Sequence, residues 1–295
     1  MTRAAAWMVL AASCSTVMNV VVRHVAAEIH PFEVTFFRCL FSLIILVPWI
    51  ARAGVTSLRT SKMWFYTLRA GVSLVSMLAW FYGITLVPLA SATALNFTAP
   101  LFATAGAALV LGEVVRLRRW VAVAIGFLGV LVILRPGAAS LDFSLLIILL
   151  SAATGGMSAV TVKFLARSES ATAIVAYMVI YLTPLSLVPA LFVWQWPSLA
   201  SLAWLVGLGA LGTVAHFALA HAYRDADASA LAPLEFLRMP FVAVLAYFIF
   251  DEVTDVWTWL GAAVIAGSSI YVAHREAQLA RRASSATPPR SAVVE

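Results

Sequence analysis

Two charged side chains interrupt an apolar run that is long enough to cross a bilayer. The run is LAPLEFLRMPFVAVLAYFIF (231–250), and the charges are Glu235 and Arg238. A charge at the bilayer centre costs roughly 3 kcal/mol, so we expect neither to face lipid. At a spacing of i to i+3 on one helix they could pair with each other. Alternatively, they line a polar cavity in which Glu235 meets an ammonium or a proton and Arg238 meets a carboxylate or phosphate.

Other polar or aromatic side chains occur inside apolar runs and are further candidates for substrate binding. They are Asn19, Arg38, Trp80, Tyr82, Asn96 and His216. An aromatic wall suits a substrate with an apolar or cationic part, because cations are attracted to ring faces. Each of these residues could instead serve helix packing or hydrogen bonding between helices, and Arg38 could extend to the interface.

The elements that must position these residues are membrane helices. Of the 295 residues, 63% are hydrophobic and only 11% are charged, with a mean hydropathy of +0.99. Soluble domains carry about 25% charged residues, and a transmembrane helix needs roughly 20 apolar residues. The chain is therefore expected to be an all-α integral membrane protein. The apolar windows predict ten spans: 4–22, 31–50, 64–87, 90–111, 120–134, 143–162, 171–194, 202–222, 228–250 and 256–273. Three of the boundaries between spans are weakly marked, so nine or eleven spans are the alternatives.

The distribution of positive charge predicts the orientation of these helices. Short cytoplasmic loops carry an excess of Lys and Arg. If both termini are cytoplasmic, all but four of the 19 Lys and Arg residues fall on that side. The exceptions are Arg23 and Arg135 in outer loops and Arg38 and Arg238 within spans. The net charge of +6 is then explained by topology, and no nucleic-acid partner is expected.

The chain contains an internal repeat. Phe97, Glu113 and Trp120 recur at one constant offset as Phe236, Glu252 and Trp259. The repeat predicts two five-helix units, residues 4–136 and 142–273, followed by a disordered basic cytoplasmic tail at 274–295. Because five is odd, the second unit enters the membrane inverted. Inverted repeats are a recurrent transporter architecture.

Repeat-matched residues near the fourth and ninth spans are predicted to act in gating. Pro100 and Pro240 interrupt helical hydrogen bonding in mid-span, which the membrane tolerates only against protein or a water-filled cavity. Glu113 and Glu252 end the same two spans at opposite faces. We expect these four residues to serve as hinges or gates.

Two stretches carry a family resemblance. VPLASATALNFTAPLFATAGAALVLGE (87–113) and ADASALAPLEFLRMPFVAVLAYFIFDE (226–252), followed by GFLGVLVILRPG (126–137) and WLGAAVIAG (259–267), resemble the paired domains of EamA-type carriers of the drug/metabolite transporter superfamily. The resemblance implies a ten-helix carrier with a central cavity. It also implies cargo among amino acids, nucleotide-related metabolites, vitamins and drugs.

These observations predict a secondary-active transporter in the inner cell membrane rather than an enzyme. The expected substrate is an amino acid or an amino-acid-like zwitterion or cation such as S-adenosylmethionine, moved by alternating access. A drug or vitamin exporter of the same fold is the alternative, and a channel or membrane-embedded enzyme is disfavoured because no nucleophile, metal or nucleotide motif is found. No cofactor or metal is expected. Proton or counter-substrate coupling, and a monomer or homodimer, remain open.

Overall fold

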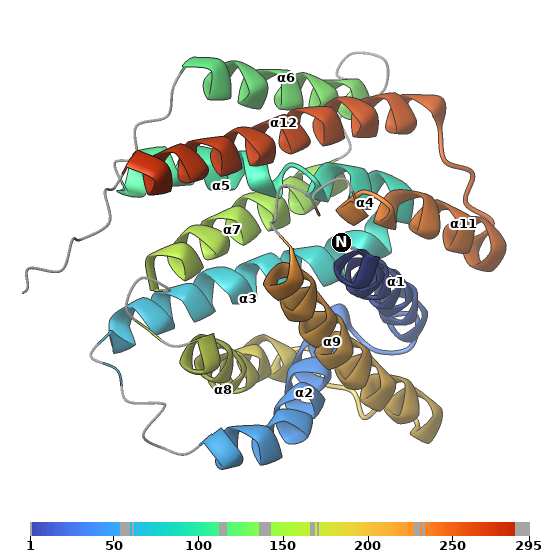
Figure 1. Cartoon of the computed structure of the whole chain (residues 1–295). Coiled ribbons are helices and arrows are strands. Elements are labelled where there is room, and N and C mark those ends of the chain that lie inside the picture. Colours follow the sequence, from blue (N-terminus) through green and yellow to red (C-terminus); the bar gives the residue numbers. More distant parts are fainter. Residues whose placement is uncertain are drawn as a thin grey trace, which may run out of the picture.

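The regular structure of the described residues is entirely helical (Figure 1). The computed structural model describes residues 2–53, 60, 62–111, 117–135, 143–165, 169, 171–226, 231 and 234–286. The helices are α1 (Thr2–Val25), α2 (Pro31–Ala53), α3 (Met63–Leu86), α4 (Leu89–Asn96), α5 (Ala99–Leu111), α6 (Leu117–Leu134), α7 (Phe143–Leu165), α8 (Ala171–Leu191), α9 (Leu199–Asp225), α11 (Arg238–Phe250) and α12 (Val256–Ala286).

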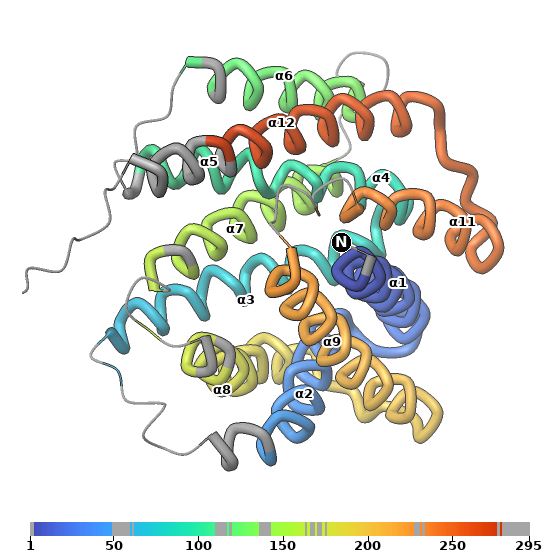
Figure 2. Tube along the Cα trace, in the orientation of Figure 1, coloured from blue at the N-terminus to red at the C-terminus, as the bar shows by residue number. Residues whose placement is uncertain are grey.

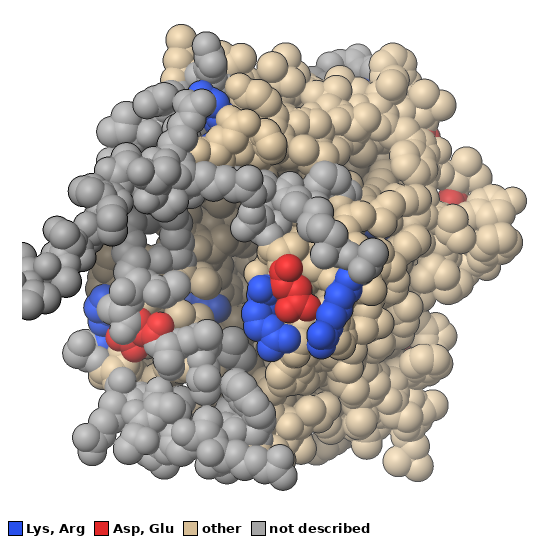
Figure 3. All heavy atoms as spheres, in the orientation of Figure 1, with Lys and Arg blue, Asp and Glu red and all other residues tan. Residues whose placement is uncertain are grey.

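Length and composition make most of these helices suitable for crossing a membrane. Among the described residues, 7 segments are long and apolar enough to span, including Leu89–Leu109, which combines α4 and α5. Three shorter apolar helices are Trp120–Leu134, Ala176–Leu191 and Arg238–Phe250. Many large apolar side chains point outward, including Leu109 and Phe248, as expected where lipid replaces water. On the face that Figure 3 shows, the charged side chains of the described residues form a few small groups within a largely uncharged surface.

The helices pack in pairs that combine the first and second halves of the sequence. The strongest contacts are those of α1 with α9, α3 with α7, α6 with α12 and α2 with α8, and Figure 2 traces these neighbours. Glycine allows α6 and α12 to approach closely, because a Cβ at Gly129 would lie 2.8 Å from the carbonyl oxygen of Gly261. Small residues at such crossings are typical of membrane helices.

Two of the expected spans are broken in the middle. The first break lies at Phe97 and Thr98, between α4 and α5; the second lies at Phe236 and Leu237, just before α11. Proline clashes with the carbonyl group four residues before it. Pro100 and Pro240 therefore disfavour continuous helix at residues 96 and 236; α4 ends at Asn96, and Phe236 already lies in the second turn.

The breaks meet in the interior of the bundle. The rings of Phe97 and Phe236, which are equivalent in the sequence repeat, pack edge to face with centroids 4.5 Å apart. Because Glu235 precedes the second break and Arg238 follows it, the two do not share one continuous helix. The sequence argument that they lie on one helical face therefore does not hold.

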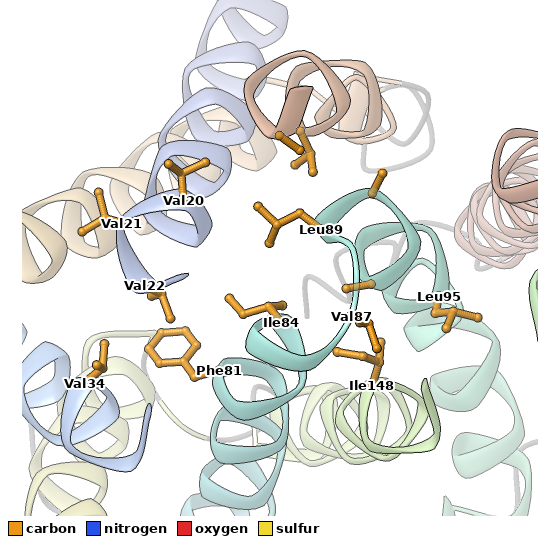
Figure 4. Close-up of a cluster of buried hydrophobic side chains, with 14 of the residues drawn as sticks. Val20, Val21, Val22, Val34, Phe81, Ile84, Val87, Leu89, Leu95 and Ile148 are labelled. Carbon is orange, nitrogen blue, oxygen red and sulfur yellow. The ribbon is translucent and has the colours of Figure 1, made fainter. Parts of the chain in front are cut away.

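A tightly packed apolar cluster lies beside the break in the first half. Val22, Phe81, Ile84 and Leu89 are at most 1% exposed, and Figure 4 shows such side chains gathered between α1, α2, α3, α4 and α7. Phe81 belongs both to this cluster and to the cavity described below.

Helix α12 is longer than expected. Residues 274–286 are helical, so the predicted disorder from residue 274 is wrong for this segment; residues 287–295 lie outside the described residues. Side-chain contacts support the extension: Arg275 Nη1 donates to Gln278 Oε1 at 2.7 Å, and Gln278 Nε2 lies 2.9 Å from His274 Nε2. Pairs at i+3 and i+4 stabilise exposed helices.

Candidate functional site

A cavity of about 290 Å³, lined by both polar and apolar side chains, lies among the central parts of the helices. Its walls come from both halves of the chain. The lining residues are Ser15, Met18 and Asn19 of α1, Arg38 of α2, Ser73, Ser76, Met77, Trp80 and Phe81 of α3, Asn96 of α4, Ser151, Gly155 and Ser158 of α7, Met178 and Leu182 of α8, and Arg238 of α11. The cavity therefore adjoins both helix breaks.

Arg38 enters the cavity from α2 and is 8% exposed. Its Nη1 donates to the Met77 sulfur at 3.0 Å, a weak acceptor. Its Nε is buried without a hydrogen-bond partner. Gly212 of α9 makes room for the guanidinium, because a Cβ there would lie 3.3 Å from Nε and Nη2.

Arg238 enters from the start of α11. Its Nη2 is 3.4 Å from Asn96 Oδ1, and its Cζ lies 5.3 Å from the centre of the Phe97 ring. Its Nε is also buried without a partner. The side chain thus connects the two helix breaks through a long hydrogen bond and a cation–π contact.

The remaining walls combine aromatic, thioether and hydroxyl groups. Trp80 Nε1 donates to Asn19 Oδ1 at 3.1 Å, which fixes the indole against α1. Ser76 and Ser151 exchange hydrogen bonds at 2.9 Å, each hydroxyl donating to the other's carbonyl oxygen. These bonds join α3 to α7 and leave small side chains at the cavity.

Five of the eight residues predicted to bind substrate line this one cavity: Asn19, Arg38, Trp80, Asn96 and Arg238. The other three lie elsewhere. Glu235 is close enough to Tyr223 and Arg238 for its charge to act on both. Tyr82 packs against His30 and Phe32, with centroids 5.9 and 6.0 Å away. His216 Nδ1 donates to the Gly212 carbonyl oxygen at 2.7 Å, and the ring is within range of the Arg38 charge.

The sequence analysis missed the hydroxyl and thioether wall. On α3, Ser76 and Met77 lie about one helical turn after Ser73. On α7, Ser151 and Ser158 are seven residues, or about two turns, apart. Small polar residues at helical spacing inside an apolar span are the signal that could have found them.

Two arginine–carboxylate pairs lie at one end of the bundle, which we call the Glu252 end. Glu252 pairs with Arg23 at 2.5 Å and accepts a hydrogen bond from the Leu89 backbone nitrogen at 2.9 Å. Arg135 pairs with Asp255. Both contacts connect the α11–α12 linker to the first half of the chain. We call these four charged side chains the ion-pair clamp.

The other predicted gating residues have different surroundings. Pro100 is exposed in the first turn of α5, and Pro240 is half-buried in the first turn of α11. Proline is well tolerated at the start of a helix. Glu113 lies outside the described residues.

A helical bundle whose central cavity adjoins two broken helices is an arrangement found in multi-pass membrane transporters, and comparison with known proteins agrees. The model of the EamA-like transporter family matches residues 2–135 and 142–273. The chain is 33% identical to the S-adenosylmethionine uptake transporter of Rickettsia prowazekii over 270 residues, which covers 92% of each chain. It is 31% identical to a riboflavin transporter of Rhizobium johnstonii, over 94% of this chain and 93% of that one.

One solved crystal structure, 18% identical in sequence, superposes with a TM-score of 0.62 over 93% of this chain and 97% of its own. That likeness supports the fold. The chain belongs to the EamA-like transporter family. It is a membrane transporter rather than an enzyme, because the family and its relatives are transporters of small molecules.

Proposed function

We propose that the protein is a secondary-active carrier of S-adenosylmethionine or a similar amino-acid-bearing metabolite, moved by alternating access around the cavity. The observation that carries the proposal is the position of the cavity, between two helix breaks and with walls from both halves. Discontinuous helices at mid-membrane form the substrate sites of many secondary transporters.

The proposed architecture has ten spans in two inverted units, residues 4–136 and 142–273, with both termini in the cytoplasm and the chain in the inner membrane. The packing supports it. Under inverted symmetry, contacts of α1 with α9 correspond to contacts of α7 with α3, and both are extensive. The proposed symmetry exchanges α6 with α12 and α2 with α8. Each of these pairs is therefore expected to pack across the twofold axis, and both pairs are in contact.

Alternating access requires closure on one side at a time. In the proposed orientation the Glu252 end faces outward, where the ion-pair clamp and the apolar cluster around Phe81 close the path to the cavity. We propose Glu252 as a gate and Pro100 and Pro240 as hinges. Coupling to protons through Glu235, or to a counter-substrate, would supply the driving force.

The cavity suits a ligand with an aromatic part and a polar part. Its volume of about 290 Å³ is at the lower end of the roughly 300–1,000 Å³ typical of ligand pockets. Trp80 and Phe81 offer ring faces, while Asn19 and Asn96 offer amides. Riboflavin is the second candidate, because a relative of similar identity transports it and its ring system would also stack on Trp80.

Counterflow into proteoliposomes tests the proposal. Purified protein is reconstituted, loaded with unlabelled S-adenosylmethionine, riboflavin or an amino-acid mixture, and supplied with the corresponding labelled compound. Saturable uptake of S-adenosylmethionine is expected. Gly155→Leu should abolish it by filling the cavity, whereas Gly207→Leu is the matched control, because no atom lies within 4 Å of a Cβ there.

Saturable uptake that Gly155→Leu leaves intact would contradict the proposed site. If riboflavin alone shows counterflow, riboflavin replaces S-adenosylmethionine as the proposed cargo. An absence of counterflow for every compound would contradict the carrier mechanism.

A further inference from the structure

The charged side chains that line the cavity are all of one sign. Arg38 and Arg238 line it, and no lining residue that the structure describes is acidic. Arg69 adds a third positive charge nearby, close enough to act on His216 together with Arg38. The lining of the cavity is therefore cationic.

The two lining arginines lack the partners that buried guanidinium groups require. A buried charge is costly unless it is paired and hydrogen-bonded. Arg38 meets a thioether, and Arg238 meets a neutral amide at 3.4 Å. Neither forms an ion pair with any carboxylate among the described residues, and Glu235 is near enough to Arg238 only for its charge to be felt. Each has an unpartnered Nε.

Backbone geometry adds to the positive potential. Helix α11 begins at Arg238, which lines the cavity, so the positive end of the helix dipole lies beside the cavity. A helix N-terminus carries a partial positive charge of roughly half an elementary unit. In transporters with broken helices, such half-helix N-termini point at anionic substrate groups.

We propose that the cavity recognises its substrate through a carboxylate held by Arg38 and Arg238, one arginine from each half of the chain. This inference rests on the proposed function and narrows its substrate class. A guanidinium presents a planar fork of donors that matches a carboxylate. The aromatic and thioether walls receive the remainder of the ligand. S-adenosylmethionine has a carboxylate, whereas riboflavin has none, so the arginines favour the first cargo.

Matched ligand pairs test the proposal by isothermal titration of the purified full-length protein. Each pair differs in the carboxylate: S-adenosylmethionine against its decarboxylated analogue, and L-methionine against L-methioninamide. We expect removal of the carboxylate to weaken binding by at least about 30-fold, which corresponds to roughly 2 kcal/mol for a buried charged contact. Arg38→Gln and Arg238→Gln should each weaken binding of the carboxylate form and reduce the difference within the pair.

Two further variants separate charge from folding. Arg38→Lys retains the charge without the fork and should give an intermediate loss. Arg135→Gln removes an arginine of the ion-pair clamp and should leave discrimination within each pair unchanged. Thermal unfolding of every variant shows whether it remains folded.

Equal affinity within the pairs, or unchanged discrimination in both glutamine variants, would overturn the inference. Preference for flavin mononucleotide over riboflavin and over every carboxylate would also overturn it, in favour of a phosphate. This test can fail without the proposed function failing. If S-adenosylmethionine shows counterflow but binds no better than its decarboxylated analogue, the carrier is retained and the carboxylate site is rejected. If only L-methionine binds better than its amide, the carboxylate site is retained and S-adenosylmethionine is rejected as the cargo.

Discussion

Arginine has different surroundings at the Glu252 end and in the cavity. In the ion-pair clamp, Arg23 contacts Glu252 and Arg135 contacts Asp255. In the cavity, Arg38 contacts a thioether and Arg238 a neutral amide. The chain thus supplies ion-pair partners to the arginines that join its halves. Among the described residues it supplies none to those that line the cavity, where Glu235 acts on Arg238 only from a longer range.

The difference separates two roles for the same side chain. A paired arginine stabilises one arrangement of the helices, because its charge lies against a carboxylate of the protein itself. An unpaired buried arginine retains unused donors, so a ligand that brings a carboxylate gains a contact that the protein does not already make. Adding an acid beside a cavity arginine should therefore change ligand binding. Removing a charge from the ion-pair clamp should instead change the stability of the fold.

The largest effect is expected when an acid is placed beside a cavity arginine. Met77→Glu would put a carboxylate where the thioether now lies 3.0 Å from Arg38 Nη1. Because the new pair would occupy the guanidinium, we expect affinity for S-adenosylmethionine to fall by about 100-fold, equivalent to roughly 2.7 kcal/mol. Titration calorimetry measures it, with Met77→Leu as the uncharged control expected to remain within a few-fold. An unchanged affinity for Met77→Glu would show that Arg38 does not hold the ligand.

A smaller effect, on stability, is expected for Glu252→Gln. This change removes the charge that pairs with Arg23 and accepts from the Leu89 backbone nitrogen, at a site that is largely buried. Hydrogen bonds to charged groups contribute about 1.5–3 kcal/mol, so the unfolding temperature should fall by several degrees in a thermal scan. Ligand affinity should remain within a few-fold. A loss of binding as large as that of the cavity variants would remove the distinction between the two regions.

A still smaller change is expected for Arg135→Gln. Arg135 and Asp255 are 39% and 44% exposed in their side chains, and Arg135 also lies 5.5 Å from the Trp257 ring. Exposed pairs contribute about 0–1 kcal/mol, so the thermal shift should be smaller than that of Glu252→Gln. The reverse order of the two shifts would show that burial does not set their contributions.

The smallest effect concerns Glu28 and depends on pH. Hydrogen bonds from the Ser201 hydroxyl, the Ser198 backbone nitrogen and the Ser198 hydroxyl lower the pKa of Glu28 below its usual value near 4.5. The stabilisation from this lowered pKa is fully present above the unfolded-state pKa and is lost as pH falls through the folded-state value. The difference in unfolding temperature between wild type and Glu28→Gln should therefore be constant from pH 7 to pH 6 and shrink below about pH 4.5. A difference that grows on acidification would contradict the assignment.

Much of the bundle could be predicted from sequence, because apolar length determines which segments can span. The prolines also indicated that two helices are interrupted. The interruption itself lies near the residue four positions before each proline, because the proline ring clashes with the carbonyl group of that residue. Asn96 and Arg238 were found as site candidates because polar groups inside apolar runs are rare. The same reasoning also selected Tyr82 and His216, which lie within continuous helices but do not line the cavity.

The surroundings of Glu235 could not be predicted in the same way. Its expected relation to Arg238 assumed a continuous helix, and the turn at Phe236 and Leu237 changes the helical phase between them. The partner of Arg38 was also hidden, since Met77 is 39 positions away in sequence. Contacts between distant helices depend on packing, which local periodicity does not encode.

The most direct test is a structure of the protein in a lipid nanodisc with S-adenosylmethionine bound. The account predicts the ligand in the cavity, with its carboxylate oxygens within about 2.7–3.2 Å of guanidinium nitrogens of Arg38 and Arg238, and its purine ring against Trp80. A ligand outside this cavity, or one whose carboxylate points away from both arginines, would contradict it.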